Sequence, residues 1–310
     1  MKAAVVRQPG RPPEYRDFPD PSPAAGEELV EVLAAGMHQI TRSQASGEHY
    51  AGHDQLPMVP GVDGIARRSD GRLIYLGGLK PPYGTLAEHA AAPRLAMPLP
   101  VDADPVVMAA SLNPGASGWM ALKLRAGMQP GQTVAVLGAT GAAGRTAVQA
   151  ARLLGAARVI AIGRSVSALS DVAGDVDDIV RIEDGTGWAD QLTGPVDVVL
   201  DYVWGRPTEQ LLPALTGKTD GHRLTWVQIG TMAGSSVPLR GDLLRSSDLH
   251  LIGSGLGSTS MRELQAEIPA VIDHIAAGRI WVDPVVRPLA EVERAWTEPV
   301  PSGRRVVFVP

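Results

Sequence analysis

One short segment, residues 138–144 with the sequence GATGAAG, has the residue types that suit a bound phosphate. It follows an unbroken apolar run at residues 133–137 and leads into a helical pattern at 142–154. A phosphate can approach the free N–H groups at the start of a helix only where the side chains are small. The helix starts with four small residues: Gly141, Ala142, Ala143 and Gly144. A glycine turn that merely packs a helix on a strand is the alternative, but the strand–helix–strand order favours dinucleotide binding.

The residues after the next strand indicate which dinucleotide is bound. In such folds an acidic residue at that place binds the ribose 2′-hydroxyl of NAD. Here the apolar run at 158–162 is followed by Gly163, Arg164 and Ser165, and the next carboxylate is Asp171, several residues later. A guanidinium and a hydroxyl suit an additional 2′-phosphate, so the sequence predicts NADP(H). The alternative is a solvated surface arginine without a ligand.

The rest of the chain divides into two kinds of pattern. Strands and helices alternate in the middle, and six apolar runs fit a doubly wound parallel sheet: 133–137, 158–162, 178–182, 196–202, 224–229 and 249–252. Residues 1–113 instead show short apolar runs broken by Pro and Gly, and such runs return after a helical pattern at 261–277. We therefore predict an α/β protein in which a nucleotide-binding domain at 115–255 is inserted into one β-rich domain, residues 1–114 and 256–310.

Composition limits the possible partners. The chain has 310 residues, 45% of them hydrophobic, and a net charge of −5, which offers no basic field for nucleic acid. It has no cysteine, which excludes disulfides, thiolate metal sites and a cysteine nucleophile and is consistent with a cytoplasmic location. We expect no secretory signal and no membrane span, because no apolar run is long enough.

Ten segments, in order along the chain, carry a resemblance to a known family: MKAAVV at 1–6, PGVDG at 60–64, YGTLAEHA at 83–90, ASGWMAL at 116–122, PGQTVAVLGATGAAGRTAVQAARLLGA from 130, DVVLDYVWG at 197–205, VQIG at 227–230, IGSGLGS at 252–258, PLAEVERAW at 288–296 and SGRRVVF at 302–308. By these segments the chain resembles the zinc-independent medium-chain dehydrogenases/reductases, close to the NADPH quinone oxidoreductases or zeta-crystallin-like group. The resemblance implies a GroES-like β-rich domain with an inserted Rossmann domain and a substrate site between them.

The resemblance also assigns coenzyme contacts to positions of this sequence. It implies that Asn113 and Ser117 lie beside the nicotinamide, and that Gly230, Ser254 and Arg305 make further contacts. The remaining expected contacts lie in the two segments already described: Ala139, Thr140, Gly141, Ala142, Ala143 and Gly144 at the pyrophosphate, and Gly163, Arg164 and Ser165 at the adenosine phosphate.

Two departures from the family pattern concern the active site. Zinc-dependent relatives bind their metal with a Cys and a later His-Glu pair, where this chain has Met37 and His38 at the first place and Val62 and Asp63 at the second. No catalytic metal is therefore expected. Quinone reductases usually carry Asn and Asp where this sequence has His38 and Thr41, so their substrate contacts do not transfer directly.

Without a metal, hydrogen-bond donors must stabilise the charge that a transferred hydride places on the acceptor oxygen. A conjugated carbonyl acceptor (quinone, enone or enoyl derivative) suits this, because its charge is delocalised. By alignment with the substrate loop of relatives, the candidate catalytic residues are Tyr50, His49 and His38. Tyr202 and Trp204, after the fourth strand of the sheet, are expected to shape the pocket.

The resemblance further implies a homodimer through the edge strands of the Rossmann sheets, with residues 249–252 as the candidate edge. Two other functions stay open at this point. One is a non-catalytic NADPH-binding protein, crystallin-like or a sensor, and the other is a biosynthetic tailoring reductase with an unknown substrate.

Overall fold

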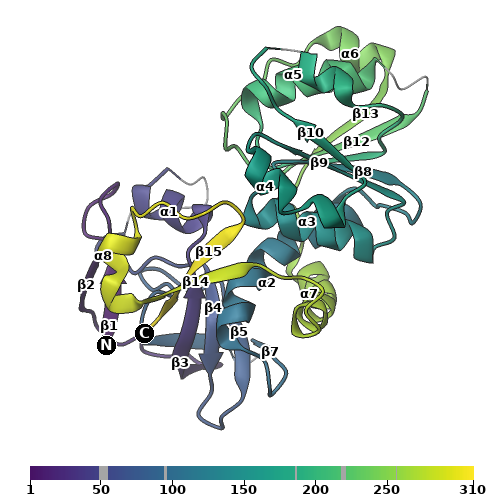
Figure 1. Ribbon diagram of the computed structural model, residues 1–310. Helices are drawn as coiled ribbons and strands as arrows, with labels where there is room; N and C mark the ends of the chain where they lie inside the picture. Colours follow the sequence, from purple (N-terminus) through teal and green to yellow (C-terminus); the bar gives the residue numbers. More distant parts are fainter. Residues whose placement is uncertain (49–54, 94–95, 186, 218–220, 256) are drawn as a thin grey trace. The chain divides into compact units, whose positions relative to one another are not determined.

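The computed structural model describes residues 1–48, 55–93, 96–185, 187–217, 221–255 and 257–310 (Figure 1). It consists of two compact units: unit 1 comprises Met1–Asn113 and Ile272–Pro310, and unit 2 comprises Pro114–Val271. Unit 2 is therefore one continuous stretch set within the sequence of unit 1. The sequence pattern predicted the second boundary at residue 255, whereas the two units divide after Val271, inside a helix.

Unit 2 is built on a parallel six-stranded sheet with the order β10-β9-β8-β11-β12-β13. The strands are β8 (Thr133–Leu137), β9 (Arg158–Gly163), β10 (Asp178–Arg181), β11 (Val198–Asp201), β12 (Arg223–Gln228) and β13 (Asp248–Gly253). The central strands β8 and β11 are almost wholly buried, because a parallel sheet carries helices on both faces. The direction of strand addition reverses between them, which is where ligands bind in sheets of this kind.

Helices cover both faces of this sheet. In Figure 1, α3 and α4 lie on one face, and α5 and α6 lie on the other. The helical elements after β8 are α3 (Ala142–Leu153), α4 (Val166–Ser170), η2 (Ala173–Asp175), η3 (Gly187–Gln191), α5 (Gly205–Thr216) and α6 (Gly241–Ser246). Before β8, α2 (Pro105–Met120) continues into a π-helical turn, η1 (Ala121–Arg125). A Cβ on Gly118 would lie 2.8 Å from the Ala147 Cα, so α2 and α3 approach backbone to backbone.

Unit 1 is mainly antiparallel β-structure. Its larger sheet has the order β14-β15-β3-β4-β5-β7, with β6 also pairing with β3, and β1 and β2 form a separate pair. The strands are β1 (Lys2–Val5), β2 (Glu14–Asp17), β3 (Glu27–Gly36), β4 (Asp63–Arg67), β5 (Leu73–Gly77), β6 (His89–Pro93), β7 (Met97–Pro98), β14 (Asp283–Pro288) and β15 (Arg304–Val309). The helical elements outside the sheet are α1 (Gln39–Ser46), α7 (Met261–Ala276), which straddles the boundary, η4 (Leu289–Glu291) and α8 (Val292–Ala295).

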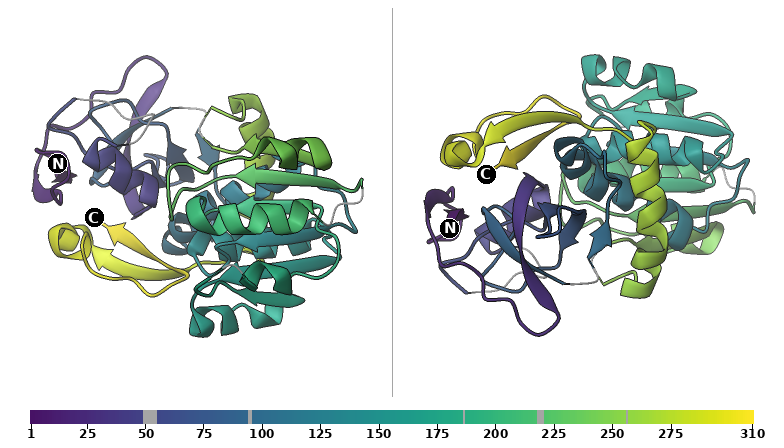
Figure 2. Two further views of the ribbon diagram at one scale, coloured as in Figure 1. Left: turned by 90° about the horizontal axis from the view of Figure 1, so that it is seen from above. Right: turned by 90° about the horizontal axis from the view of Figure 1, so that it is seen from below.

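The last strand of the chain is joined to the N-terminal part of unit 1. β15 pairs with β3 through Val307 opposite Gly36, and the Met37 N–H donates to the Val306 carbonyl at 2.9 Å. Both ends of the chain therefore belong to the same unit, as Figure 2 shows. This pairing places Arg305 beside the residues that follow β3.

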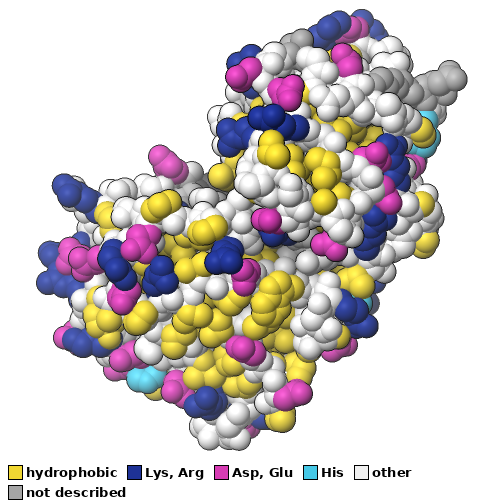
Figure 3. Space-filling model, viewed as in Figure 1, with side chains coloured by type: hydrophobic (Ala, Val, Ile, Leu, Met, Phe, Trp, Pro, Cys, Tyr) yellow, Lys and Arg dark blue, Asp and Glu magenta, His cyan; other side chains and the backbone are white. Residues whose placement is uncertain are grey.

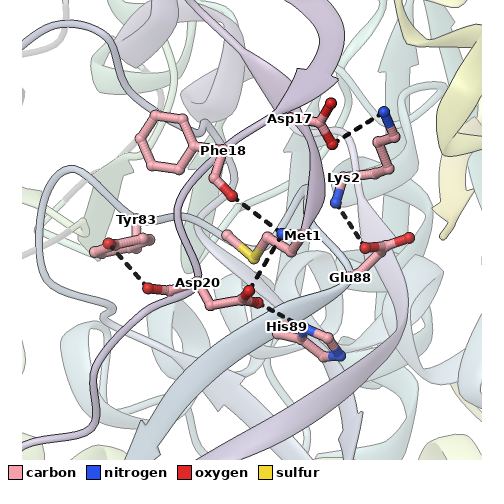
Figure 4. Close-up of polar contacts among 8 residues, drawn as sticks. All are labelled: Met1, Lys2, Asp17, Phe18, Asp20, Tyr83, Glu88 and His89. Carbon is pink, nitrogen blue, oxygen red and sulfur yellow. Dashed lines mark hydrogen bonds and ion pairs between the residues drawn. The ribbon is translucent and has the colours of Figure 1, made fainter.

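Polar contacts link the start of β1 to the residues after β2 and to the start of β6 (Figure 4). The Met1 amino group donates to the Phe18 carbonyl at 3.1 Å and to Asp20 Oδ2 at 3.3 Å. The other Asp20 oxygen lies 2.9 Å from His89 Nδ1. The hydrogen bond with His89 and the Met1 amino group hold the pKa of Asp20 below its usual value. The Asp20 and His89 side chains are exposed, so we expect their ion pair to contribute little to stability.

Two further observations describe the molecule as a whole. On the face that Figure 3 shows, basic and acidic side chains are interspersed rather than gathered by sign. No helix in the part of the chain that the structure describes is long and apolar enough to cross a membrane.

Candidate functional site

The segment at residues 138–144 forms a tight turn between β8 and α3. Gly138 has φ +93°, a left-handed conformation that favours glycine. A Cβ on Gly144 would lie 2.1 Å from the Gly138 carbonyl oxygen, so no side chain fits there. At Gly141 the same oxygen would be 3.6 Å away, an ordinary contact. Glycine is therefore needed at 144 for the fold, whereas at 141 its small size leaves space above the turn.

The start of α3 is open to a ligand. Its N-cap is Gly141, and no side chain caps the N–H groups of the first turn. Such N–H groups need an acceptor, and the positive end of the helix dipole favours an anion. The geometry fits the pyrophosphate of a dinucleotide, which would accept from these groups in a cradle that any added side chain would fill.

The end of β9 lies against this turn. A Cβ on Gly163 would be 2.9 Å from the Thr140 side chain, so its glycine allows the two segments to approach. Arg164 is exposed, and the structure records no ion pair for it within the residues described. Ser165 caps α4 by accepting from the Ala168 N–H at 3.3 Å. The Asp171 carboxylate forms an ion pair with Arg145 at 2.8 Å. The nearest acid is thus engaged, and a guanidinium is left available for a phosphate.

A buried carboxylate shapes the turn after β11. Asp201 Oδ1 accepts from the Val203 and Trp204 N–H groups, both at 2.8 Å, and Oδ2 accepts from the Thr208 hydroxyl at 2.5 Å and the Trp226 indole at 3.1 Å. Burial raises the pKa of Asp201, although these four bonds oppose the shift. The bonds hold Trp204 at φ +55°, and it is the one described residue other than glycine with positive φ.

Trp204 lines a pocket, wide open to solvent, at the carboxyl ends of the strands. The pocket has a volume of about 430 Å³, and Gln228, Thr231 and Gly253 also line it. The predicted coenzyme residues Gly230 and Ser254 follow β12 and β13 at the same edge. A Cβ on Gly230 would lie 2.5 Å from the Tyr202 carbonyl oxygen, so glycine is required where the segments after β11 and β12 approach each other.

Unit 1 contains a buried polar network. His38 follows β3 and is 3% exposed, and Asp63 begins β4 and is 4% exposed. His38 Nε2 lies 2.5 Å from Asp63 Oδ1, and the Tyr75 hydroxyl donates to Asp63 Oδ2 at 2.8 Å. The guanidinium of Arg305 donates to His38 Nδ1. Residues from four elements, of which β15 is distant in sequence from the other three, thus supply a continuous chain of hydrogen bonds.

The bonds define the protonation states in this network. A guanidinium can only donate hydrogen bonds, so His38 Nδ1 must be unprotonated to accept from Arg305. The proton of the neutral imidazole is then on Nε2, which donates to Asp63. Burial and the charge of Arg305 lower the pKa of His38, which agrees with a neutral imidazole. Burial alone would raise the pKa of Asp63, but His38, Tyr75 and Arg305 outweigh it and lower that pKa. Burial raises the pKa of Tyr75, so it stays a donor.

Local structure fixes the imidazole in place. The His38 N–H donates to the Thr41 hydroxyl at 3.4 Å, which secures the backbone at the start of α1. A Cβ on Gly36 would be 3.0 Å from the imidazole and 2.7 Å from the Ala109 carbonyl oxygen. The Asp63 carbonyl accepts from the Thr85 hydroxyl at 2.7 Å.

Comparison with known proteins decides the family. No protein-family model matches the chain. A probable NADPH-dependent quinone reductase of Emericella nidulans is 32% identical over 361 aligned positions, which cover all of both chains. The chain belongs to the quinone oxidoreductase group of the medium-chain dehydrogenases/reductases.

Solved structures agree with this family. The quinone oxidoreductase of Thermus thermophilus, whose structures include a complex with NADPH, has a TM-score of 0.85 and 28% identity, with both chains covered completely. An alcohol dehydrogenase superfamily protein of Novosphingobium aromaticivorans has a TM-score of 0.83 at 22% identity, with 100% and 99% covered, and supports the fold. The predicted α/β fold, the NADP(H) coenzyme and the oxidoreductase class of the family are confirmed.

The structure brings together some of the predicted site residues. In unit 2 the residues of the glycine turn and of the β9 end adjoin each other, and Gly230 and Ser254 share the carboxyl edge of the sheet. In unit 1, His38 and Arg305 are in contact. The half-buried Asn113 and Ser117 both lie on α2, but they belong to different units. Tyr50 and His49 lie outside the described residues.

Three functional features had no sequence signal. Asp63 was noted only as a replacement for a metal ligand, Tyr75 was not singled out, and the role of Asp201 was missed. Each acts through a partner that only the folded chain brings close. The spacing of these residues along the sequence therefore could not have revealed them.

Proposed function

We propose that this chain transfers a hydride from NADPH to a conjugated carbonyl acceptor, a quinone, an enone or an enoyl derivative, with no metal ion. The observation that carries the proposal is the uncapped start of α3 at Gly141, with the exposed Arg164 beside it, in a chain of the quinone oxidoreductase group. The relatives in that group are named for quinone reduction with NADPH.

The residues of unit 2 would hold the coenzyme, which supplies the hydride when bound. N–H groups at the start of α3 bind the pyrophosphate, and Arg164 binds the 2′-phosphate, with Ser165 beside it. Gly230 and Ser254 border the nicotinamide end at the carboxyl edge of the sheet, and Asn113 and Ser117 are its predicted neighbours on α2. Trp204 supplies an apolar wall to the pocket there.

The acceptor requires donors for its oxygen. A conjugated carbonyl spreads the arriving charge through its π system, so hydrogen bonds suffice where other dehydrogenases use a metal. Tyr50 and His49 are our predicted donors. His38 is too deeply buried to touch a substrate and uses both ring nitrogens within the protein, so we assign it a positioning role.

We further propose a cytoplasmic homodimer. Within the described part of the chain, β13 is an edge strand of the sheet and pairs with β12 alone, so its other side can pair with the same strand of a second copy. Light scattering would give the mass, and hydrogen exchange would test the edge. Alternate amides of β13 point toward β12 and toward the free edge. Slow exchange of both sets supports the pairing, and a monomer whose edge-facing amides exchange fast contradicts it.

The decisive experiment measures NADPH oxidation with a panel of quinones, enones and enoyl thioesters. We expect turnover that NADH supports poorly, with one acceptor class clearly preferred. A preference confined to one elaborate acceptor would indicate a tailoring reductase. Binding of NADPH without oxidation by any acceptor would contradict the proposal and favour the non-catalytic alternative.

A further inference from the structure

The Arg305 guanidinium is a half-buried cation with unused hydrogen-bonding capacity. A guanidinium has five N–H donors. The structure records one hydrogen bond from this group within the residues described, to His38 Nδ1. Burial lowers the pKa of Arg305 to about 10, so it stays charged at neutral pH. The remaining donors are available to an oxygen atom brought next to them.

Among the residues that the structure describes, Arg305 also lacks the direct carboxylate partner that buried arginines usually have. The neighbouring Arg304 is exposed and does have such a partner, because its guanidinium contacts Asp283 at 2.9 Å. The negative charge nearest to Arg305 is Asp63, which it reaches through the neutral imidazole of His38. The charge of Arg305 is thus balanced by Asp63 without direct contact between the two groups. The N–H donors of Arg305 that do not bind His38 have no recorded partner among the described residues.

The His38 network fixes the direction of this cation. His38 Nδ1 can only accept, because Nε2–H donates to Asp63, and Tyr75 holds the second Asp63 oxygen. An acceptor that cannot turn or change tautomer anchors one edge of the guanidinium. Donors held in this way need no reorganisation when charge develops in front of them.

We propose that Arg305 is a catalytic residue that binds the carbonyl oxygen of the acceptor, and that His38 and Asp63 position it. This inference rests on the proposed function. As the hydride adds to the conjugated carbon, the π electrons move onto the carbonyl oxygen, which becomes an enolate or phenolate hydrogen-bonded to Arg305. The coenzyme leaves oxidised, the product takes one proton from solvent, and Arg305 keeps its own.

Charge balance favours this oxygen over a coenzyme phosphate as the partner of Arg305, for which the sequence predicted a coenzyme contact without naming the group. Arg305 and Asp63 together carry no net charge, so a permanent phosphate anion would gain little from entering the network. A neutral carbonyl can enter the network without adding a net negative charge to it. The charge that then appears on it is met by donors already in place, which stabilises the transition state more than the ground state.

The first experiment compares Arg305→Met with Arg304→Met, a matched change one residue earlier. We expect Arg305→Met to lower kcat about 100-fold, the usual effect of losing an oxyanion donor, with the calorimetric Kd for NADPH within about twofold of the parent. Arg304→Met should change neither. A weaker NADPH affinity with unchanged kcat would overturn the proposal and favour the coenzyme contact that the sequence predicted for Arg305. Arg305→Lys keeps the charge but not the planar pair of guanidinium donors, and it should recover part of kcat. It is the control for a loss of kcat that comes only from misfolding of the Met variant.

The second experiment tests positioning by His38. Asn places an amide oxygen near the position of Nδ1, so His38→Asn keeps an acceptor for Arg305, whereas His38→Leu does not. We expect the parent kcat to fall in acid as His38 protonates and Nδ1–H faces the Arg305 cation, with Asp63 holding the other nitrogen. His38→Asn should keep most of kcat and lose this acid limb, and His38→Leu should lose kcat. Equal behaviour of the two variants would overturn the positioning role.

A third experiment needs no turnover and separates this inference from the proposed function. 4-Nitrophenol is titrated into the protein saturated with NADP⁺, and its absorbance reports the anion. We expect the parent to bind the phenolate about tenfold more tightly than the phenol, as a charge-assisted hydrogen bond requires, and Arg305→Met to lose this preference. An equal preference in both proteins would contradict the role of Arg305. A parent that reduces no acceptor yet shows the preference would refute only the proposed function.

Discussion

The proposed pyrophosphate site of unit 2 and the polar network of unit 1 are built in opposite ways. The proposed pyrophosphate site consists of backbone N–H groups in seven consecutive residues, and its side chains matter mainly by their absence. The network of unit 1 consists of side chains, and two members that touch, His38 and Arg305, are 267 residues apart in the sequence. A site of the first kind can be read from a short sequence, whereas one of the second kind exists only after folding.

The difference also determines how each site can fail. A backbone site loses a donor only when proline replaces a residue, so other substitutions disrupt it when their side chain blocks the approach. A side-chain network fails when one member is removed, because its neighbours then keep buried polar groups without partners. The following predictions use this contrast, beginning with a place in unit 2 that departs from it.

Asp201→Ala should have the largest effect on stability, because Asp201 is the centre of a buried side-chain network in unit 2. The change leaves four donors around Asp201 without an acceptor and releases the strained Trp204. We expect a loss of about 3–5 kcal/mol in the free energy of unfolding, measured with urea. The exposed Asp184→Ala should cost less than about 0.5 kcal/mol. Equal costs would show that the buried carboxylate is dispensable.

Two alanine substitutions within one turn should separate fold from ligand. Gly144→Ala places a Cβ 2.1 Å from a carbonyl oxygen and should cost about 1–3 kcal/mol of stability. Gly141→Ala meets that oxygen at 3.6 Å and should leave stability within about 0.5 kcal/mol. Its methyl group should nevertheless weaken NADPH binding about tenfold, by calorimetry. Unchanged affinity in Gly141→Ala would mean that no phosphate approaches this turn.

Arg164→Ala tests the one charged side chain assigned to the coenzyme in unit 2. We expect the KM for NADPH to rise about tenfold, and that for NADH less than twofold, because only NADPH carries the 2′-phosphate. Arg223→Ala, at the opposite end of the sheet, is the control. An equal rise for both coenzymes would remove the assignment of Arg164.

The smallest effect concerns the pH dependence of unit 1. Burial and Arg305 lower the pKa of His38 from 6.5, so the unfolded chain binds a proton more readily than the folded one. Its contribution to stability is complete above pH 6.5 and is lost as pH falls through the lower folded pKa, by at most ~1.4 kcal/mol per pH unit. Urea unfolding of the parent and of His38→Asn at several pH values measures it. Parallel curves for the two proteins would mean that His38 is not buried neutral.

Sequence patterns were sufficient for much of unit 2. The six parallel strands, the glycine turn and the end of β9 follow from local apolar runs and small residues, and the structure has each of them. The predicted bounds were less accurate where geometry is not local. The run predicted as a strand at 196–202 is a strand only at Val198–Asp201, because the Asp201 carboxylate turns the chain directly afterwards.

Unit 1 was harder to predict for the same physical reason. His38 and Arg305 were singled out by resemblance, one as catalytic and the other as a coenzyme contact, but nothing in the sequence indicated that they touch. Their contact depends on the pairing of β15 with β3, which joins the two ends of the chain. Long-range strand pairing has no local signal in the sequence.

The most direct test of the account follows the hydride itself. NADPH carrying deuterium at the transferable C4 position is mixed with the protein and an enone, and the product is analysed by mass spectrometry. The account predicts one deuterium on the β-carbon of the product for each NADPH oxidised. A reduced product without deuterium, or no consumption of NADPH with any acceptor, would contradict it.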